Sequence, residues 1–532
     1  MKLTFIGACH EVTGSCFLLQ YDGLNILIDS GMKQGTSDLV SVPLPINEWE
    51  IDYIFLTHAH IDHSGNIPYL YKKGFRGKVI CTIGTKELSN IMLKDSAYIQ
   101  MSDAAWINKH NERSGKEKVE PLYTIEDVEN VLKRFEEYDY QDIISISDNI
   151  SIVFQDAGHL LGSASIIDML GTKTNYTSIV FSGDIGNENQ PLIKNPSNII
   201  GQVDYVVMES TYGNRLHEKP KDYISLLASI IQKTFDRGGD LIIPSFAVGR
   251  AQELLYFIRE IKEKNMIRNH PNFKVYLDSP LANEATEIYD KRVLSYCNSE
   301  TAALIEQGIN PIIFNGLVRT TSVLDSRAIS ANENPKIIIS AAGMCDAGRI
   351  RHHLKHNLWR SECTIMFVGY QAVGTLGRII LDGATKVKIF GEEIKVSAEI
   401  IQFPGISAHA DSNGLVKWIS ALSEKPKKVF VVHGDDNSTI SFCHRLHEYG
   451  LDAVAPYSGT EYNLLTNEFE HTAGPTRIAI TSHGNSFSKS FSKLLDAYEN
   501  LGEVVNMYEY CANKDIAKFT TQICDLAQRW DD

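Results

Sequence analysis

The stretch Thr57-His58-Ala59-His60-Ile61-Asp62-His63-Ser64-Gly65 directly follows the apolar run Asp52–Thr57. That run predicts a strand that is buried on both of its faces. Because side chains two apart in an extended segment point the same way, His58 and His60 are placed to grip one metal ion. Neutral imidazoles and carboxylates are ligands that suit zinc.

Asp62 and His63 predict a second ion beside the first. If the chain turns into a helix at Ser64-Gly65, these two side chains are aimed away from the first ion. The alternative is a histidine-rich surface loop. Four such ligands within residues 58–63, directly after a core strand, disfavour that alternative.

Three further predicted strands share this design, each ending in a histidine or an aspartate beside a glycine: Ser151–Gln155 before His159, Ser178–Ser182 before Asp184, and Lys428–Val432 before His433. Taken alone, each of these residues is more often a satisfied turn residue than a ligand. Because strand ends of a layered fold converge on one edge, the set predicts a single site with two metal ions.

Counting donors gives a site for two zinc ions per chain, bridged by Asp184, whose carboxylate has two oxygens. The ligands divide into two sets, His58, His60 and His159 for one ion and Asp62, His63 and His433 for the other. Asp29, at the end of the predicted strand Leu24–Asp29, is expected to orient a ligand histidine. Two ions roughly 3.5–4 Å apart lower the pKa of a shared water to around 7 and stabilise charge during in-line attack.

Protonating a leaving group requires a positioned acid. The segment Ser407-Ala408-His409-Ala410-Asp411 supplies a histidine outside the ligand count. Glu209 is the carboxylate expected to hydrogen-bond His409 and favour its protonated form. The alternative is that either residue is a structural surface group.

The pattern of predicted strands and helices changes twice along the chain. Up to about residue 205 it predicts short apolar strands, with helices at Thr85–Met101 and Ile125–Tyr138. Beyond 210, strands alternate with helices, which predicts a mostly parallel sheet covered by helices: Leu241–Phe246, Lys274–Leu277, Lys336–Ser340 and Thr364–Val368 each precede a helix. After about 395 the strand-rich pattern returns with Glu399–Phe403, so an outer domain interrupted by an inserted one fits the order.

Composition limits the class of protein. The 532 residues predict two to four domains, and no apolar run approaches the roughly 18 residues of a membrane span. Nine cysteines without a CxxC pair argue against disulfides and predict a cytoplasmic protein. A net charge of −15 makes the chain a poor non-specific nucleic-acid binder, so a role with RNA requires a local basic groove or bound metal.

Together these motifs resemble the metallo-β-lactamase superfamily, specifically its β-CASP branch of nucleic-acid processing enzymes. The resemblance covers about residues 1–460 and rests on motifs in matching order: HAHIDH at 58–63, GHLLG with His159, SGDIG with Asp184, ESTYG at 209–213, GRAQELL at 249–255, SAHAD at 407–411 and VVHGD at 431–435. The sequences of these motifs are similar to those of the cleavage and polyadenylation specificity factor endonuclease and its bacterial and archaeal relatives. It is less similar to ribonuclease J, which usually has glutamate at the position of Ile61.

The resemblance implies an α/β fold, a metallo-β-lactamase αββα sandwich interrupted by an inserted parallel-sheet β-CASP domain, plus a small α/β C-terminal extension. The implied domains are the first part of the sandwich at 1–209, the β-CASP domain at 210–395, the second part of the sandwich at 396–465, and the extension at 474–532. For the extension we expect strands at Arg477–Thr481 and Glu503–Tyr508 and helices at Phe487–Glu499 and from Asn513 onward. A dimerisation or partner-docking element is its expected role.

The resemblance also implies a function, that of a zinc-dependent ribonuclease in RNA processing or decay. Glu209 and His409 would be the acidic residue and the catalytic histidine, beside Asp62, and His433 the final metal ligand. RNA-processing members have histidine at that last position, where DNA-repair members have valine. Endonuclease and 5′-exonuclease action both fit, and no nucleotide-binding motif appears.

Arg250 and Arg378, beside glycine turns, and Ser407 are candidates for RNA contacts. Either arginine would alternatively pair with an acidic neighbour. Two other functions compete with the ribonuclease. The low basic content slightly favours a small-molecule metallo-hydrolase acting on thioesters or lactones, which the inserted domain disfavours. A non-catalytic RNA-processing subunit has no need of the intact ligand set.

Overall fold

The computed structural model describes residues 1–35, 39–172, 175–218, 222–372, 374–404, 407–477 and 519–524. The chain divides into two compact units, Met1–Pro475 and Thr476–Asp532. Residues 519–524 of the second unit are helical, and the other elements expected in the extension lie outside the described residues. Among the described helices, none is long and apolar enough to cross a membrane.

Two large mixed sheets lie face to face in the first unit. The strand order of the first is β23 (Glu468–His471), β22 (Glu461–Asn463), β1 (Lys2–Gly7), β2 (Cys16–Tyr21), β3 (Leu24–Ile28), β4 (Tyr53–Phe55), β5 (Lys78–Thr82) and β6 (Phe135–Tyr138). That of the second is β21 (Ala453–Val454), β20 (Lys428–Val432), β11 (Tyr205–Glu209), β10 (Asn175–Phe181), β9 (Ala164–Thr172), β8 (Ile150–Asp156) and β7 (Ile143–Ser147).

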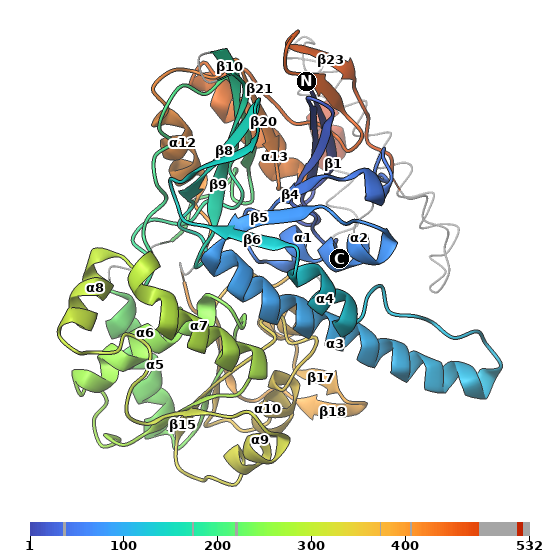
Figure 1. The fold of residues 1–532 in the computed structure, drawn as a ribbon. Helices are drawn as coiled ribbons and strands as arrows, with labels where there is room; N and C mark the ends of the chain where they lie inside the picture. The colour runs from blue at the N-terminus through green and yellow to red at the C-terminus, as the bar shows by residue number, and fades with distance from the viewer. Residues whose placement is uncertain are drawn as a thin grey trace. The chain divides into compact units, whose positions relative to one another are not determined.

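The central strands of each sheet are buried on both faces, as their apolar sequences require. Phe17 and Phe55 of the first sheet pack against Phe154 and Phe181 of the second. On its outer side the first sheet is covered by α2 (Ile67–Lys73), α3 (Ile83–Ser114) and α4 (Ile125–Leu132), and the second by α12 (Ser412–Ser420) and α13 (Asp436–Glu448) (Figure 1). This layering confirms the predicted αββα sandwich.

The segment between the two parts of the sandwich builds a separate sheet, in which every neighbouring pair is parallel. Its order is β14 (Leu317–Arg319), β13 (Lys274–Leu277), β15 (Lys336–Ser340), β12 (Leu241–Pro244), β16 (Thr364–Phe367) and β19 (Glu399–Gln402). One face is covered by α5 (Tyr223–Asp236), α6 (Arg250–Glu263) and α7 (Pro280–Tyr296), and the other by α10 (Ile350–Asn357) and α11 (Leu376–Leu381). The predicted parallel sheet is therefore confirmed.

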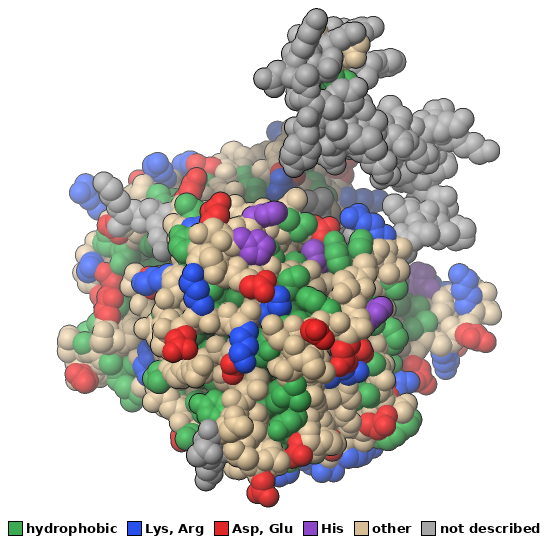
Figure 2. All heavy atoms as spheres, turned by 90° about the horizontal axis from the view of Figure 1, so that it is seen from above, with side chains coloured by type: hydrophobic (Ala, Val, Ile, Leu, Met, Phe, Trp, Pro, Cys, Tyr) green, Lys and Arg blue, Asp and Glu red, His purple; other side chains and the backbone are tan. Residues whose placement is uncertain are grey.

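Several short elements complete the first unit. They are η1 (Glu48–Glu50), α1 (Ile61–Ser64), α8 (Ser299–Glu306), α9 (Val323–Ile329) and the hairpin of β17 (Lys386–Ile389) and β18 (Glu392–Lys395). Figure 2 shows one face of the molecule, on which acidic and basic side chains are interspersed.

Two predicted elements are wrong in part. The helix expected over Ile125–Tyr138 ends at Leu132, and Phe135–Tyr138 is instead the edge strand β6, paired in parallel with β5. The strand expected to return the chain to the outer domain, Glu399–Phe403, is β19, which pairs with β16 at the edge of the inserted sheet. In both cases a partner distant in sequence decides the outcome.

Strand direction brings the motif residues to one edge of the sandwich. β8 and β10 both run antiparallel to β9, while β10, β11 and β20 are parallel neighbours. β3 and β4 of the facing sheet are also parallel. The residues that follow these strands, or end them, therefore gather at one edge: Asp29, His58, His159, Asp184, Glu209 and His433.

Candidate metal centre

Close backbone contacts hold the loops of this edge together. Gly186 N–H donates to the Ala157 carbonyl at 2.8 Å, and a Cβ on Gly186 would lie 1.7 Å from the Gly158 carbonyl oxygen. Only glycine allows this approach, which joins the loop of His159 to that of Asp184. The loop of His433 is held similarly, since its N–H donates to Ala8 at 2.7 Å and its carbonyl accepts from Ser210 at 3.1 Å.

The first group of ligand atoms consists of three imidazoles and one carboxylate oxygen, all buried or nearly so. His60 Nδ1 lies 3.0 Å from His58 Nε2 and 3.2 Å from His159 Nε2. Asp184 Oδ2 lies 3.3 Å from His58 Nε2 and 3.4 Å from His159 Nε2. A tetrahedral zinc ion with bonds of about 2.0–2.1 Å separates its ligands by about 3.3–3.4 Å, so this group fits the ion.

The second group shares Asp184 and adds one more carboxylate. His63 Nε2 lies 3.2 Å from His433 Nε2 and 3.2 Å from Asp184 Oδ1. His433 Nε2 lies 3.5 Å from Asp62 Oδ2. Asp184 thus presents one oxygen to each group, as a bridging carboxylate must. All seven residues named as ligands from the sequence come together here, in the two sets that the donor count gave.

The protonation of the imidazoles differs between the two groups. Burial, reinforced by neighbouring imidazoles, lowers the pKa of His58 and His159 and takes the pKa of His60 to about 3. These rings are therefore neutral, which is the form that binds metal.

In the second group, burial also lowers the pKa of the imidazoles, but nearby carboxylates raise it by more. Carboxylates raise the pKa of His63 and of His433, above all Asp184. The excess negative charge that attracts protons here would equally be neutralised by a cation.

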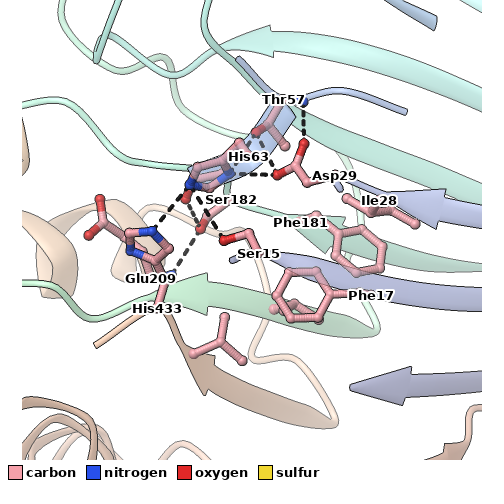
Figure 3. A pocket seen from close by; sticks show the side chains of 13 residues that line it. Ser15, Phe17, Ile28, Asp29, Thr57, His63, Phe181, Ser182, Glu209 and His433 are labelled. Atoms are coloured by element: carbon pink, nitrogen blue, oxygen red, sulfur yellow. Dashed lines mark hydrogen bonds and ion pairs between the residues drawn. The ribbon is translucent and has the colours of Figure 1, made fainter. Parts of the chain in front are cut away.

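Asp29 fixes the direction of His63. Its Oδ2 lies 2.7 Å from His63 Nδ1, and it accepts from the Thr57 hydroxyl at 2.8 Å and, through Oδ1, from the Thr57 N–H at 2.8 Å. Figure 3 shows His63 between Asp29 and His433, with Phe17 and Phe181 on the apolar side. Because Asp29 occupies Nδ1, Nε2 is the nitrogen that faces the second group.

His409 and Glu209 meet beside the first group. His409 Nδ1 lies 3.2 and 3.3 Å from the two oxygens of Glu209, and its Nε2 lies 3.9 Å from Asp184 Oδ2. Glu209, 1% exposed, also accepts from the N–H of Ile185 at 2.6 Å. Burial alone would lower the pKa of His409, but Glu209 and Asp184 together raise it to about 9. His409 is therefore protonated at neutral pH.

Sequence reasoning missed three residues that support the site. The Thr57 hydroxyl lies 3.1 Å from His58 Nδ1, and the Thr211 hydroxyl lies 3.1 Å from His433 Nδ1. His217 Nε2 lies 3.0 Å from the carbonyl oxygen of His409. Thr57 directly precedes His58, and Thr211 follows Glu209 by two residues within the ESTYG motif. A hydroxyl so close to a candidate ligand or acid could have been predicted to support the site.

The three residues predicted to contact RNA each make a contact within the protein. Arg250 is buried and lies 2.5 Å from Glu253, and Arg378 lies 2.8 Å from Asp382, so both pair with an acidic neighbour three or four residues on, the alternative noted above. The Ser407 hydroxyl accepts from the N–H of His409 at 3.3 Å. Ser407 thus supports the loop of the histidine.

An αββα sandwich with a cluster of histidines and aspartates at one edge is the architecture of a metallo-hydrolase. Three family models match the chain: Metallo-beta-lactamase superfamily at 11–196, Beta-Casp domain at 251–380, and Zn-dependent metallo-hydrolase RNA specificity domain at 393–456. The chain belongs to the metallo-β-lactamase superfamily and, within it, to the β-CASP branch.

Three relatives illustrate the similarity. The chain is 34% identical over 442 residues to a ribonuclease from Thermus thermophilus, covering 83% of this chain and 95% of the relative. It is 32% identical over 462 residues to a transcription termination factor from Methanosarcina mazei, covering 84% and 69%. It is 30% identical over 462 residues to an RNase J-like protein from Methanocaldococcus jannaschii, covering 86% and 98%.

Among solved structures, the fold is shared with a protein of unknown function from Enterococcus faecalis V583. The TM-score is 0.51 at 13% sequence identity, covering 86% of this chain and 99% of that one. This likeness concerns the fold alone.

Proposed function

We propose that the protein is a zinc-dependent ribonuclease that hydrolyses the phosphodiester bonds of RNA, in RNA processing or decay. One observation carries the proposal: Asp184 faces both groups of imidazoles, and His409 Nε2 stands 3.9 Å from it. This arrangement supports a two-ion hydrolytic site with a proton donor beside it.

Each residue would have a definite task. His58, His60 and His159 would hold one zinc ion and Asp62, His63 and His433 the other, with Asp184 shared. When bound, the two ions would lower the pKa of a water to around 7 and stabilise charge on the phosphate. His409 would keep a proton on Nε2 and give it to the leaving oxygen, while Glu209 holds Nδ1.

The inserted domain is proposed to cap this site. Its helix α7 reaches the sandwich through the Tyr296 hydroxyl, which accepts from the N–H of Gly84 at 2.9 Å, and through the Tyr289 hydroxyl, 3.5 Å from the N–H of Leu161. Leu161 lies two residues from His159. The predicted domain bounds, 210–395, would then extend to include β19.

RNA is proposed as the substrate on two grounds. The matched segment 393–456 is described as an RNA specificity domain, and relatives are named as a ribonuclease and an RNase J-like protein. His433, which the family resemblance associates with RNA-processing members, lies in the second group of candidate ligands.

The test uses purified protein with end-labelled RNA and DNA of the same sequence, with and without a chelator. We expect RNA to be cleaved, DNA to be cleaved much more slowly, and chelation to abolish cleavage. Labels at each end separately distinguish endonuclease from 5′-exonuclease products. Equal cleavage of DNA, activity after complete zinc removal, or hydrolysis only of thioesters or lactones would contradict the proposal.

A further inference from the structure

The inserted sheet has a topological switch point at its strand β12. The chain leaves β12 for α6, on one face of the sheet, but it leaves the neighbouring strands β15 and β16 for α10 and α11, on the other face. The loop after β12, residues 245–249, therefore parts from the loop after β15, residues 341–349. In open α/β sheets, ligands bind outside the carboxyl ends of the strands at such a point.

The loop 245–249 lies against the first group of candidate ligands. A Cβ on Gly249 would lie 3.2 Å from Cδ1 of Leu160, which directly follows His159. Ala247 shares a buried cluster with Leu160 and with Ala59, the residue between the candidate ligands at positions 58 and 60. The switch point of the inserted sheet and the metal centre of the sandwich are therefore adjacent.

Phe246 presents an open aromatic ring at the switch point. It is 50% exposed, although the residues on either side of it are buried. One side of the ring rests on the loop 341–349, since a Cβ on Gly343 would lie 3.3 Å from Cδ2 and 3.4 Å from Cε2 of the ring. Tyr370, three residues beyond β16, is also 50% exposed. A ring that is supported on one side and open on the other is suited to a flat partner.

The loops around Phe246 are fixed to one another. Gln371 is buried, and its Nε2 donates to the Gly343 carbonyl at 3.2 Å, which joins the segment after β16 to the loop after β15. The Ser245 N–H donates to the Ser340 carbonyl at 3.0 Å. Because these contacts hold the surroundings of the ring in place before a ligand arrives, less ordering remains to oppose binding.

We propose that Phe246 is a substrate-binding residue, on which one base of the RNA stacks close to the cleaved bond. Every base has a flat π-face, so an aromatic platform holds RNA without selecting its sequence. The inference rests on the proposed ribonuclease function and adds a contact to a base where the metal centre would contact the phosphate. The three residues from Phe246 to Gly249 span at most about 11 Å, so the stacked base would lie within a few nucleotides of the cleaved bond.

Cleavage is measured with the full chain on RNAs that are identical except for one abasic nucleotide, placed in turn at each position that flanks the cleaved bond. Phe246→Ala is expected to lower kcat/KM on the intact RNA by about 5–100-fold, because one stacked base is worth about 1–3 kcal/mol. At one abasic position the unmodified protein should lose as much. Phe246→Ala should lose nothing further there, because both changes remove the same contact.

Two variants control for damage to the fold. Phe246→Trp keeps an aromatic platform and is expected to cleave the intact RNA as the unmodified protein does. Trp359→Ala removes a ring that is 58% exposed at the opposite edge of the inserted sheet, beside Arg360, which pairs with Asp240 before β12. It should not change cleavage. Zinc content should be the same in all three variants, and a slow Phe246→Trp variant with normal zinc would contradict the inference.

The outcomes separate this inference from the proposed function. If the unmodified protein cleaves RNA but Phe246→Ala cleaves it as Trp359→Ala does, or is slowed by the same factor at every abasic position, the ring does not stack on a base. If Phe246→Ala turns a dimer into a monomer without changing cleavage, a second copy covers the ring, and the inference is wrong. If the unmodified protein cleaves no RNA but Phe246→Ala still weakens binding of intact RNA and not of one abasic RNA, the ribonuclease proposal fails and the stacking contact stands.

Discussion

His409 faces both oxygens of Glu209 with one ring nitrogen, at 3.2 and 3.3 Å, and turns the other nitrogen towards Asp184. The carboxylate is buried and also receives a backbone N–H, so it is fixed before the histidine meets it. In the proposed mechanism, this arrangement would hold a proton on the side of His409 that faces the two groups of candidate ligands. It would separate the proposed proton donor from the residues that would hold the ions.

His409→Ala is expected to lower kcat by about 10²–10⁴-fold, the range for loss of a general acid, while two zinc ions per chain remain. Zinc content by mass spectrometry and cleavage rate on the same preparation check this. His444→Ala serves as control, because His444 is exposed on α13. Loss of zinc together with activity would make His409 a ligand instead of an acid.

Glu209→Gln is expected to shift the pH dependence of kcat/KM. Glu209 is the largest of the contributions that raise the pKa of His409 against burial, so its removal lowers that pKa. A general acid works only while protonated, and the alkaline limb of the profile should therefore move to lower pH. Profiles of the variant and the unmodified protein from pH 5 to 10 check this. An unmoved alkaline limb would show that another group is the acid.

The sequence predicted the site better than the surrounding sheets, and the reason is physical. His58, His60, Asp62 and His63 stand within six residues, and the remaining candidate ligands each follow an apolar strand, so strand direction brings them together. The partner of a histidine's second ring nitrogen, the one that faces away from the other candidate ligands, can come from a distant part of the sequence. The hydroxyl of Thr211 reaches His433 across more than two hundred residues, so its place two residues after Glu209 marks it as a site residue but does not identify His433 as its partner.

The two misplaced elements failed for a related reason. Phe135–Tyr138 continues a helical pattern, yet it pairs with β5, where its backbone hydrogen bonds are satisfied in a parallel ladder. Glu399–Gln402 has only two apolar residues between polar ends, a sequence that does not specify one sheet, and β16 offers it an open edge. Local pattern decides that a segment forms a strand, and tertiary contacts decide which sheet it joins.

The two ligand groups predict distinct losses of metal. His60→Ala should leave about one zinc ion per chain, because the second group keeps all of its ligands, whereas Asp184→Asn should reduce both sites. Because the ions would bind only the folded chain, removing them by chelation should also lower Tm. Zinc analysis and thermal denaturation check both expectations. Equal loss in the two variants would contradict the division into two groups.

Asp168 predicts an unusual dependence of stability on pH. It lies on β9 between Ile166 and Leu170, on the same face of the strand, which points into the core of the sandwich, and both of its oxygens are buried without a hydrogen-bond partner among the described residues. Burial raises its pKa well above the ordinary value. From the unfolded pKa of about 4 up to the raised folded pKa, the folded chain holds a proton that the unfolded chain releases, so stability falls as pH rises.

Asp168→Val removes this carboxylate with little change of shape and suits a strand. The free energy of unfolding should increase by about 1–3 kcal/mol, the cost of an unsatisfied buried polar group, and the gain should be larger at pH 8 than at pH 5. Urea denaturation at both pH values checks this. Asp103→Val, at an exposed position of α3, is the control for the substitution itself. A destabilised Asp168→Val variant would mean that the buried carboxyl contributes a contact that the fold depends on.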